Sequence, residues 1–588
     1  MGGDQVERRD VGGAERAESV WARPRREPRA GKHGPFTSRA FCPLLVERGG
    51  SAVTPIADQR PSNPRTKVHW FDSGPWVGVA AGLVLVMLIA VLIVPAILRN
   101  GEFTYPVDDS YIHLAISQNL AEHGVLGINP DEFSSASSSP IWPLLIASGI
   151  LVAGPRVGVP LALAIISALA LLIGLDRWAQ NRGFGFGERT LFIGSLLIVV
   201  PLPVLALTGM EHVLQAAVSF LLLWLGVVAA TRADRNRSTV LILSLASFFC
   251  VATRFEGVFV VAATMAVLAW ARRWKEVVAV AVAGAVPLLI VGLVNSGQGW
   301  PVLPASVVAK TTAATSGLAR YLPTPDVYQW LRTPRLVSVV ALTLLVALFG
   351  RRAMGSDWPV RNTLFSVGAL IVSGLHLLYA HTGFFYRYEA YLMVLCLAAV
   401  ALGLHTLLAA GRLGSMNLAF RIGVVALLVV AGVDGVRIYG KAAAGMNEIH
   451  QQQIQMARFA ASACPGCRVA VNDIGAVAFY GDGTVMDVFG IANNSVLQRR
   501  LDGDYDGEAV GDIAREEGVS LAMVYPPKEF SMIPSIPDGW DRLGSWRIES
   551  NQVVGEPVVD FYSVDPSRTA QLQRAWNSFD PAGAKKGA

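Results

Sequence analysis

Two adjacent carboxylates, Asp108 and Asp109, begin a polar stretch, residues 107–133, that directly follows the first long apolar segment. Carboxylates near hydrocarbon are costly, so charged groups in such a position are functional candidates. Capping a helix is the alternative role, because Asp is a favoured N-cap residue, but a cap needs one Asp and not two. A carboxylate within reach of a hydroxyl group can act as a general base. The sequence therefore predicts that this pair is catalytic.

An apolar residue recurs at every fourth position after the acid pair, which predicts a helix that carries Ile112, Ile116 and Leu120 on one face. Four more polar clusters interrupt apolar sequence elsewhere: TGMEH at 208–212, TRFEG at 253–257, LPASVVAK at 303–310 and FFYRYEAY at 384–391. Lys and Arg are the usual partners of phosphate. The candidates for a phosphate site are therefore Lys310, Arg387 and Arg254. Snorkelling towards lipid headgroups is the alternative role for such cations.

The same clusters supply candidates for binding a second, hydroxyl-bearing ligand: Tyr111, His113, Glu211, His212, Glu256, Tyr388 and Glu389. For Glu211 and Glu256, a favourable interaction with the helix dipole is the alternative. For the aromatic residues the alternative is a belt at the membrane interface. Asp473 and Asp487, at predicted strand positions near the C-terminus, are interpreted as structural.

The composition indicates a polytopic membrane protein. Of the 588 residues, 53% are hydrophobic and only 16% are charged, and the mean hydropathy is +0.45. The formal net charge of +5 comes from residues 1–70, which hold thirteen Lys or Arg against eight Asp or Glu, so the charge does not indicate a nucleic-acid partner. A basic segment before the first apolar run fits a cytoplasmic N-terminus.

Twelve apolar runs are candidates for membrane spans: 74–98, 138–155, 157–175, 190–210, 213–230, 238–253, 255–271, 277–294, 336–350, 362–381, 390–411 and 422–436. Pro140 and Pro143 lie at the start of the second run. If that run lies along the membrane surface, five loops that together hold fourteen Lys or Arg all face the cytoplasm: 176–189, 231–237, 272–276, 351–361 and 412–421. We therefore predict eleven spans, with the N-terminus inside, the C-terminus outside, and every polar cluster on the outer side.

The chain divides into four predicted parts: a disordered cytoplasmic tail (1–70), a transmembrane domain (71–440), a periplasmic or extracellular α/β domain (441–565) and a flexible tail (566–588). In the third part, residues 468–481, 484–491 and 519–526 resemble strands, and residues 445–462 and 507–517 resemble helices. Cys464 and Cys467 form the motif CPGC. A local disulfide is favoured over a redox or metal pair, because no second CxxC or His pair accompanies it.

Taken together, these motifs resemble the GT-C superfamily of polytopic membrane glycosyltransferases. The resemblance covers roughly residues 74–440 and is carried by DDSYIHLAISQNLAEHGVLGINPDE, SSPIWPLL, TGMEH, TRFEG and LPASVVAK. It is strongest to the terminal arabinofuranosyltransferase-like branch of actinobacteria, in which TGLET commonly stands in place of TGMEH and an Asn in place of Ala305. The phrase VAVNDIGAVAFYGDGTVMDVFGI also recurs in similar proteins.

The resemblance implies a helical membrane fold of about eleven transmembrane helices, with juxtamembrane helices in the first outer loop. It also implies inverting transfer of a sugar, arabinofuranose or a hexose such as mannose, from a polyprenyl-phosphate donor. The acceptor would be a cell-envelope glycan, lipid or protein at the outer face of the plasma membrane, and membrane lipids would be further partners. No cofactor is indicated with certainty, and a divalent metal at the acid pair stays an open alternative.

Two other classes of function compete with this prediction. A transporter or lipid-linked sugar flippase would use the acid pair as a coupling site. However, transporters usually carry charges near the bilayer midplane, whereas here the charges cluster at one face. A binding or scaffold protein built around the outer domain would leave the acid pair unexplained.

Overall fold

The computed structural model describes residues 74–234, 236–311, 333–412, 414, 418–527 and 532–587, apart from the side chains of residues 310, 311 and 419. Eight helices in these ranges are long and apolar enough to cross a membrane. They are α1 (Trp76–Asn100), α4 (Gly158–Gln180), α7 (His212–Thr231), α10 (Trp274–Gly297), α12 (Pro334–Met354), α13 (Val360–Tyr379), α14 (Ala390–Ala409) and α15 (Leu418–Ile449). The chain is therefore a multi-pass membrane protein, as predicted. The predicted tail at 1–70 lies outside the described residues.

Three of the predicted spans are short or interrupted. The span predicted at 190–210 is two helices, α5 (Phe186–Ile198) and α6 (Leu202–Leu207). Pro201 lies between them and has no N–H group with which to continue the first helix. The helices α8 (Arg237–Thr253) and α9 (Gly257–Trp270) have 17 and 14 residues. Each predicted span thus has a helical counterpart, and the count of eleven stays a prediction.

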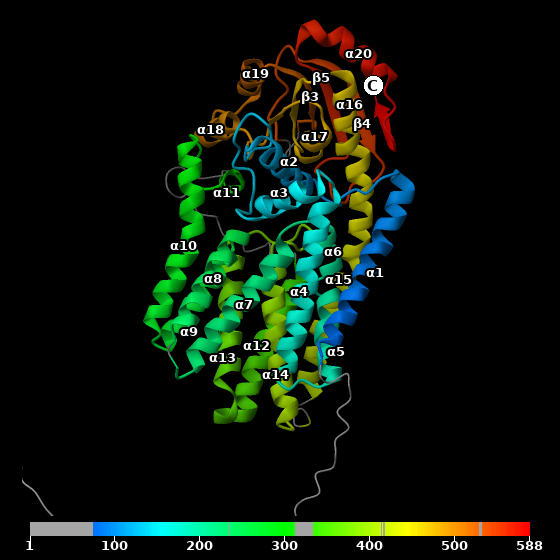
Figure 1. Ribbon diagram of the computed structural model, residues 1–588. Coiled ribbons are helices and arrows are strands. Elements are labelled where there is room, and N and C mark those ends of the chain that lie inside the picture. Colours follow the sequence, from blue (N-terminus) through cyan, green and yellow to red (C-terminus); the bar gives the residue numbers. More distant parts are fainter. Residues whose placement is uncertain are drawn as a thin grey trace, which may run out of the picture. The chain divides into compact units, whose positions relative to one another are not determined.

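The segment between α1 and α4 contains two helices, α2 (Asp109–His123) and α3 (Trp142–Ala153). With 12 residues, α3 is about 18 Å long at a rise of 1.5 Å per residue, well short of a bilayer core of about 30 Å. Figure 1 shows α2 and α3 between the membrane helices and the C-terminal sheet. The prediction that residues 138–155 form a juxtamembrane segment is confirmed.

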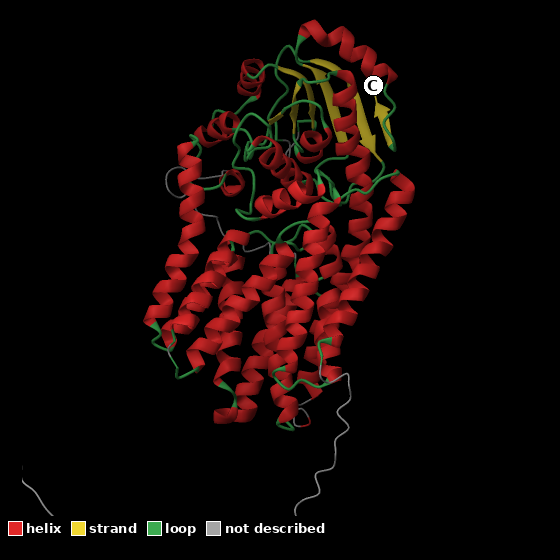
Figure 2. Ribbon diagram, in the orientation of Figure 1, coloured by secondary structure: helices red, strands yellow, loops and turns green. Residues whose placement is uncertain are grey.

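The C-terminal domain is built on one six-stranded sheet, drawn in yellow in Figure 2, with the strand order β2-β1-β3-β5-β4-β6. The strands are β1 (Arg468–Val471), β2 (Val485–Asp487), β3 (Val519–Val524), β4 (Asp541–Ile548), β5 (Val558–Ser563) and β6 (Ala584–Gly587). β1 pairs in parallel with β2 and β3, and the remaining pairs are antiparallel. All six residues of β3 are buried, as expected for an apolar strand that is covered on both faces.

Helices surround this sheet and confirm the predicted α/β domain. They are α16 (Gln455–Ala463), α17 (Gly475–Tyr480), α18 (Asn494–Asp502), α19 (Gly507–Glu516) and α20 (Thr569–Ser578). The basic loops 176–189 and 351–361 lie at the end of the membrane bundle away from this domain (Figure 1).

Three details differ from the expectation. Residues 468–481 are not one strand, because β1 ends at Val471 and a turn leads into α17. The expected flexible tail at 566–588 instead forms a 3-10 turn (Pro566–Arg568), α20 and β6, and β6 pairs with β4. The chain also has no break at residue 440, since α15 runs to Ile449 and continues through a π-helical turn (His450–Ile454) into α16.

The helix α2 is fixed by packing against the C-terminal domain. Ile112 and Ile116, two members of the predicted apolar stripe, belong to one hydrophobic core with residues of that domain, among them Val471, Ile474 and Val477. Burial of apolar surface of this kind is the main stabilising term in protein interiors. It holds the start of α2, and with it the acid pair, against the end of β1.

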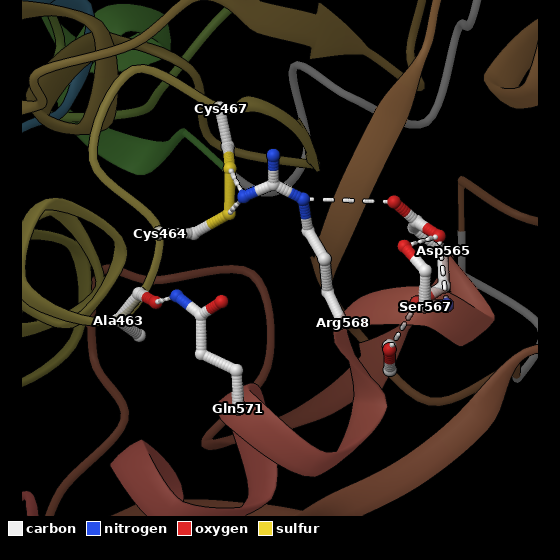
Figure 3. The surroundings of a disulfide bond; sticks show 8 residues. Ala463, Cys464, Cys467, Asp565, Ser567, Arg568 and Gln571 are labelled. Atoms are coloured by element: carbon white, nitrogen blue, oxygen red, sulfur yellow. Dashed lines mark hydrogen bonds and ion pairs between the residues drawn. A yellow bond between two sulfur atoms is a disulfide. The ribbon is translucent and has the colours of Figure 1, made fainter.

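The CPGC motif is closed by a disulfide between Cys464 and Cys467, which confirms the favoured prediction. Figure 3 shows the guanidinium of Arg568 beside both sulfurs, with Nη1 3.5 Å from the Sγ of Cys464 and 3.2 Å from that of Cys467. The side chain of Gln571 donates from Nε2 to the carbonyl of Ala463 at 2.9 Å. These contacts attach the start of α20 to the turn that precedes β1.

Candidate active site

A cavity of about 270 Å³ lies where the start of α2 meets the C-terminal domain. The acid pair Asp108 and Asp109 lines it together with His113 from α2. Its remaining walls come from segments far apart in the sequence: Ser138, Met210, Ser306, Phe384, Arg387, Tyr388, Asn472, Asp473, Phe489 and Met532. The wall from the C-terminal domain follows the carboxyl ends of the parallel strands β1 and β2, where open α/β sheets usually bind ligands.

Asp108 is held by both of its carboxylate oxygens. Oδ2 accepts the N–H of Gly475 at 2.7 Å, and Oδ1 accepts the N–H of Ala476 at 2.8 Å. A side chain at position 475 would collide with Asp108, because an added Cβ would lie 2.3 Å from its carbonyl oxygen. The turn after β1 therefore needs glycine in order to approach α2. Each oxygen keeps a second lone pair with which to accept a proton.

Asp109 forms an ion pair with Arg387 across the cavity. The Asp109 side chain is 41% exposed and that of Arg387 only 3%. Arg387 also donates from Nη2 to the hydroxyl of Tyr388 at 3.1 Å and lies 3.0 Å from the sulfur of Met210. Its Nε has no hydrogen-bond partner among the described residues. A buried guanidinium at a cavity wall with an unused donor is suited to an anionic ligand.

Arg254 is enclosed by two glutamates. Its Nη1 lies 2.6 Å from Oε1 of Glu211, and its Nη2 lies 2.6 Å from Oε1 of Glu256. The other oxygen of Glu256, Oε2, accepts from Nε of Arg254 at 3.1 Å. Ser138 joins the network, 3.3 Å from both Arg254 and Glu211. The donors of Arg254 are thus engaged by carboxylates, and its phosphate-binding role stays a prediction. Glu211 and Glu256 in turn serve first to hold Arg254.

A second cavity of about 300 Å³ adjoins the first and shares Ser138, Ser306 and Tyr388 with it. Its other walls are mainly apolar and include Phe255, Val258, Phe259, Val307 and Tyr379, while the predicted site residues Arg254 and Glu256 also line it. It lies at the start of α9 and beside α11 (Ala305–Thr311). A polar cavity that opens onto an apolar one at the edge of a helical bundle could accommodate a ligand with a charged head and a hydrocarbon tail.

Not every predicted site residue lies at these cavities. Tyr111 is fully buried, packs edge-to-face against the ring of Tyr105 and accepts the N–H of Tyr105 at 3.1 Å. His212 is buried with its ring 6.2 Å from that of Tyr388. Glu389 accepts the N–H of Gly383 at 3.1 Å. None of the three lines either cavity, and the side chain of Lys310 lies outside the described residues.

Two residues of the C-terminal domain, Asn472 and Asp473, were missed by the sequence-based prediction. Asp473 was interpreted as structural, yet both residues line the cavity beside the acid pair. Their position directly after a strand was the available signal, since loops after parallel strands often bind ligands. Asp487 is structural, as expected: its carboxylate accepts the N–H groups of Phe489 and Ala492, both at 2.8 Å.

The acids of the cavity do not titrate like exposed ones. Burial, followed by the neighbouring charge of Asp473, raises the pKa of Asp108 to about 8. Burial also raises the pKa of Asp473, although the hydrogen bonds from Tyr525 and Gln453 act in the opposite direction. The pKa of His113 is lowered, chiefly by burial, although the charges of Glu211 and Asp109 act in the opposite direction. His113 lies 3.6 Å from Glu211 through Nε2, and its Nδ1 has no hydrogen-bond partner among the described residues.

The described part of the chain contains no group of three or more His, Cys, Asp or Glu that could hold a metal ion. The cations that face the acids are instead arginines.

Comparison with known proteins gives one match to a family model and several to solved structures. Residues 447–562 match a family described as a domain of unknown function, DUF8728. No curated protein sequence matches the chain. The segment that matches the family model contains Asn472 and Asp473, so the family's domain supplies one wall of the cavity.

Among solved structures, the chain is similar to ArnT from Cupriavidus metallidurans bound to undecaprenyl phosphate, with 13% identity over 84% of this chain and 98% of that one and a TM-score of 0.48. It is also similar to the arabinofuranosyltransferase AftD from mycobacteria, with 14% identity over 83% of this chain and 41% of that one and a TM-score of 0.44. The structure of ArnT in the apo state is 14% identical over 83% of this chain and 99% of that one, with a TM-score of 0.38. We base the functional proposal on the geometry of the site.

Proposed function

We propose that this protein is a membrane glycosyltransferase that moves a sugar from a polyprenyl-phosphate donor to a hydroxyl group of a cell-envelope acceptor. One observation carries the proposal: a rigidly held carboxylate, Asp108, and a buried arginine, Arg387, line one polar cavity, and an apolar cavity adjoins it. The motifs that resemble the GT-C superfamily supply part of the lining of this polar cavity, including Asp108, Asp109, Ser138, Met210 and Ser306.

In this proposal the donor's phosphate binds Arg387. Glycosyl transfer leaves a polyprenyl phosphate with additional negative charge, and a fixed cation in a site shielded from water stabilises that charge. The unused Nε of Arg387 is available for it. The ion pair with Asp109 orients the guanidinium before the donor binds. Lys310 is a second proposed phosphate ligand, and the apolar cavity would take the first isoprene units of the donor.

Asp108 is the proposed general base. Its carboxylate is fixed by two N–H groups, and a pKa of about 8 makes it more basic than an ordinary aspartate. A base whose pKa lies close to the working pH is the most effective for proton transfer. Asp108 would take the proton of the acceptor hydroxyl while the acceptor oxygen attacks the anomeric carbon opposite the leaving phosphate. Attack from that side inverts the configuration of the anomeric carbon.

We further propose that the site faces the outside of the plasma membrane, with the N-terminus in the cytoplasm. The basic loops at the end of the bundle away from the C-terminal domain support this orientation. A reporter fused after residue 185 should then be cytoplasmic, and one at the C-terminus should be periplasmic or extracellular. A reporter after residue 185 that is accessible from outside would reverse the orientation.

Sugar transfer can be measured directly with the purified full-length protein in lipid nanodiscs. Radiolabelled polyprenyl-phosphate arabinofuranose and polyprenyl-phosphate mannose would be the donors, and cell-envelope glycan fragments the acceptors. We expect label in the acceptor with at least one donor, and its loss in Asp108→Asn but not in Asp512→Asn, an exposed acid of the C-terminal domain. Movement of the donor across the bilayer without transfer of sugar would favour the flippase alternative instead.

A further inference from the structure

Asn472 contributes a hydrogen-bond donor that nothing in the described chain uses. The side chain is 7% exposed, and its Oδ1 accepts the N–H of Tyr525 at 2.6 Å. Only the oxygen of the amide can accept that bond, so the orientation of the amide is fixed. Asn472 lines the cavity, and its buried Nδ2 has no hydrogen-bond partner among the described residues. Buried polar groups are normally satisfied, so an orphaned donor at a cavity indicates a ligand.

Asp473 presents an acceptor next to that donor. Its Oδ2 takes hydrogen bonds from Nε2 of Gln453 at 2.7 Å and from the hydroxyl of Tyr525. Its Oδ1 accepts none from the described residues, while the residue lines the cavity. The two bonds to Oδ2 hold the carboxyl group in place and leave Oδ1 for a ligand. A carboxyl group bonds to a hydroxyl in either of its protonation states.

The surroundings of Asn472 and Asp473 indicate which kind of ligand they would bind. A donor beside an acceptor matches two neighbouring hydroxyl groups, because each hydroxyl both donates and accepts. Asp108, Asp109 and Asp473 all line this cavity, which disfavours an anionic group beside Asp473, whereas the cation Arg387 offers a separate place for the donor's phosphate. The rings of Phe489 and Tyr388 add apolar walls. A neutral saccharide with a vicinal diol fits these conditions.

We infer that Asn472 and Asp473 bind two neighbouring hydroxyl groups of the saccharide acceptor, so that the C-terminal domain forms the acceptor-binding wall of the cavity. The inference rests on the proposed function in so far as the bound saccharide is the acceptor. One short turn would then do two things, since it holds the acceptor through residues 472 and 473 and fixes Asp108 through the N–H groups of Gly475 and Ala476. Acceptor and base would thus be aligned by the same turn.

Binding can be measured without catalysis by saturation-transfer difference NMR on the full-length protein in nanodiscs. The probes are an arabinofuranosyl and a mannosyl trisaccharide, each with a set of single-deoxy analogues. The variants are Asp473→Asn, which removes the charge and keeps the shape, and Asn472→Asp, which removes the donor and keeps the bond to Tyr525. Asp512→Asn is the matched control, because that acid pairs with Arg515 at the exposed surface. Thermal unfolding shows that each variant is folded.

We expect the wild type and Asp512→Asn to bind one trisaccharide equally, and both cavity variants to bind it at least about tenfold more weakly. Removing the matching hydroxyl from the ligand should weaken binding to the wild type by a similar factor, and should have little further effect on Asp473→Asn. Failure of the wild type to bind either trisaccharide, or equal binding by folded cavity variants, would overturn the inference. If the saccharide binds as expected but no sugar is transferred from the donors, the proposed function fails and this inference stands.

Discussion

Two groups of buried ion pairs lie at opposite ends of the helical bundle. At the end away from the C-terminal domain, Arg189 binds Asp176 through Nε at 2.6 Å and through Nη2 at 2.9 Å. Arg189 also donates to the carbonyl of Gly74, and Asp176 accepts the N–H of Gly78. Neither side chain leaves a buried polar atom without a partner among the described residues. This pair joins the starts of α1 and α5 to the end of α4.

The pairs near the C-terminal domain use the same residue types but leave atoms unsatisfied. Arg387 has an orphaned Nε although it pairs with Asp109. His113 has an orphaned Nδ1, and Asn472 an orphaned Nδ2. All of these residues line one cavity. An unpaired buried polar group destabilises the folded protein. The comparison therefore distinguishes an ion pair whose polar atoms are all used from a site in which donors remain for the proposed ligand.

The largest expected effect is on transfer in Asp108→Asn. Loss of a positioned general base should lower the rate about a hundred- to ten-thousandfold. Asn can still accept one of the two N–H bonds from the turn, so the protein should stay folded and should bind donor. Single-turnover kinetics with radiolabelled donor measure the rate. A rate close to that of the wild type would remove Asp108 from the mechanism.

Asp176→Asn should have the opposite pattern of effects, lowering the stability of the protein and leaving the transfer rate unchanged. It leaves Arg189 with an uncompensated charge in a buried position, where the side chain is 2% exposed, and breaking such a pair typically costs about 3–5 kcal/mol. We expect a clear fall in the melting temperature in nanodiscs, with an unchanged transfer rate per folded molecule. A variant of normal stability with impaired transfer would erase the distinction between the two groups of ion pairs.

Arg387→Ala should raise the KM for the polyprenyl-phosphate donor about ten- to a hundredfold, because it removes a charge-assisted hydrogen bond to the phosphate. The control is Arg99→Ala, an exposed arginine that pairs with Glu549 at 3.5 Å. Donor titrations at saturating acceptor give the donor KM of Arg387→Ala and of Arg99→Ala. An unchanged donor KM in Arg387→Ala would place the phosphate elsewhere.

The smallest expected effect is a change in pH dependence. Because Asp108 must be deprotonated to act as a base, transfer should rise with pH through a pKa of about 8. The groups that influence this pKa include Asp473, Asp109 and Tyr525. Asp473→Asn removes a negative neighbour, which lowers the pKa of Asp108 and moves the rise to lower pH. The shift is measured as the pH profile of kcat at saturating acceptor. An unshifted profile would show that Asp108 and Asp473 are not coupled.

The membrane helices, the juxtamembrane segment and the α/β domain could be predicted from sequence because apolar length and charge placement determine them locally. Asp108 and Asp109 were found for the same reason, since paired acids at a membrane edge are locally unusual. The role of Asp473 could not be found in this way. It depends on the docking of α2 onto the end of β1, a contact between segments more than 350 residues apart, and a lone Asp after a strand resembles an ordinary turn residue.

The ion pairs of Arg254 could not be predicted from sequence either. In the sequence it is an isolated cation beside one acid, which suits a phosphate ligand. In the structure Glu211, from a different cluster, completes its neutralisation. A sequence reveals which charges exist near the membrane edge, but pairing across helices decides which of them remain available to a ligand.

The most direct test of the account is a structure of the Asp108→Asn variant with bound polyprenyl-phosphate sugar. We predict density for the phosphate within hydrogen-bond distance of Arg387, the isoprenoid chain in the adjoining apolar cavity, and the sugar between them and residue 108. A donor bound at the opposite end of the bundle, or a phosphate held by Arg254 with Arg387 still paired only to Asp109, would contradict the account.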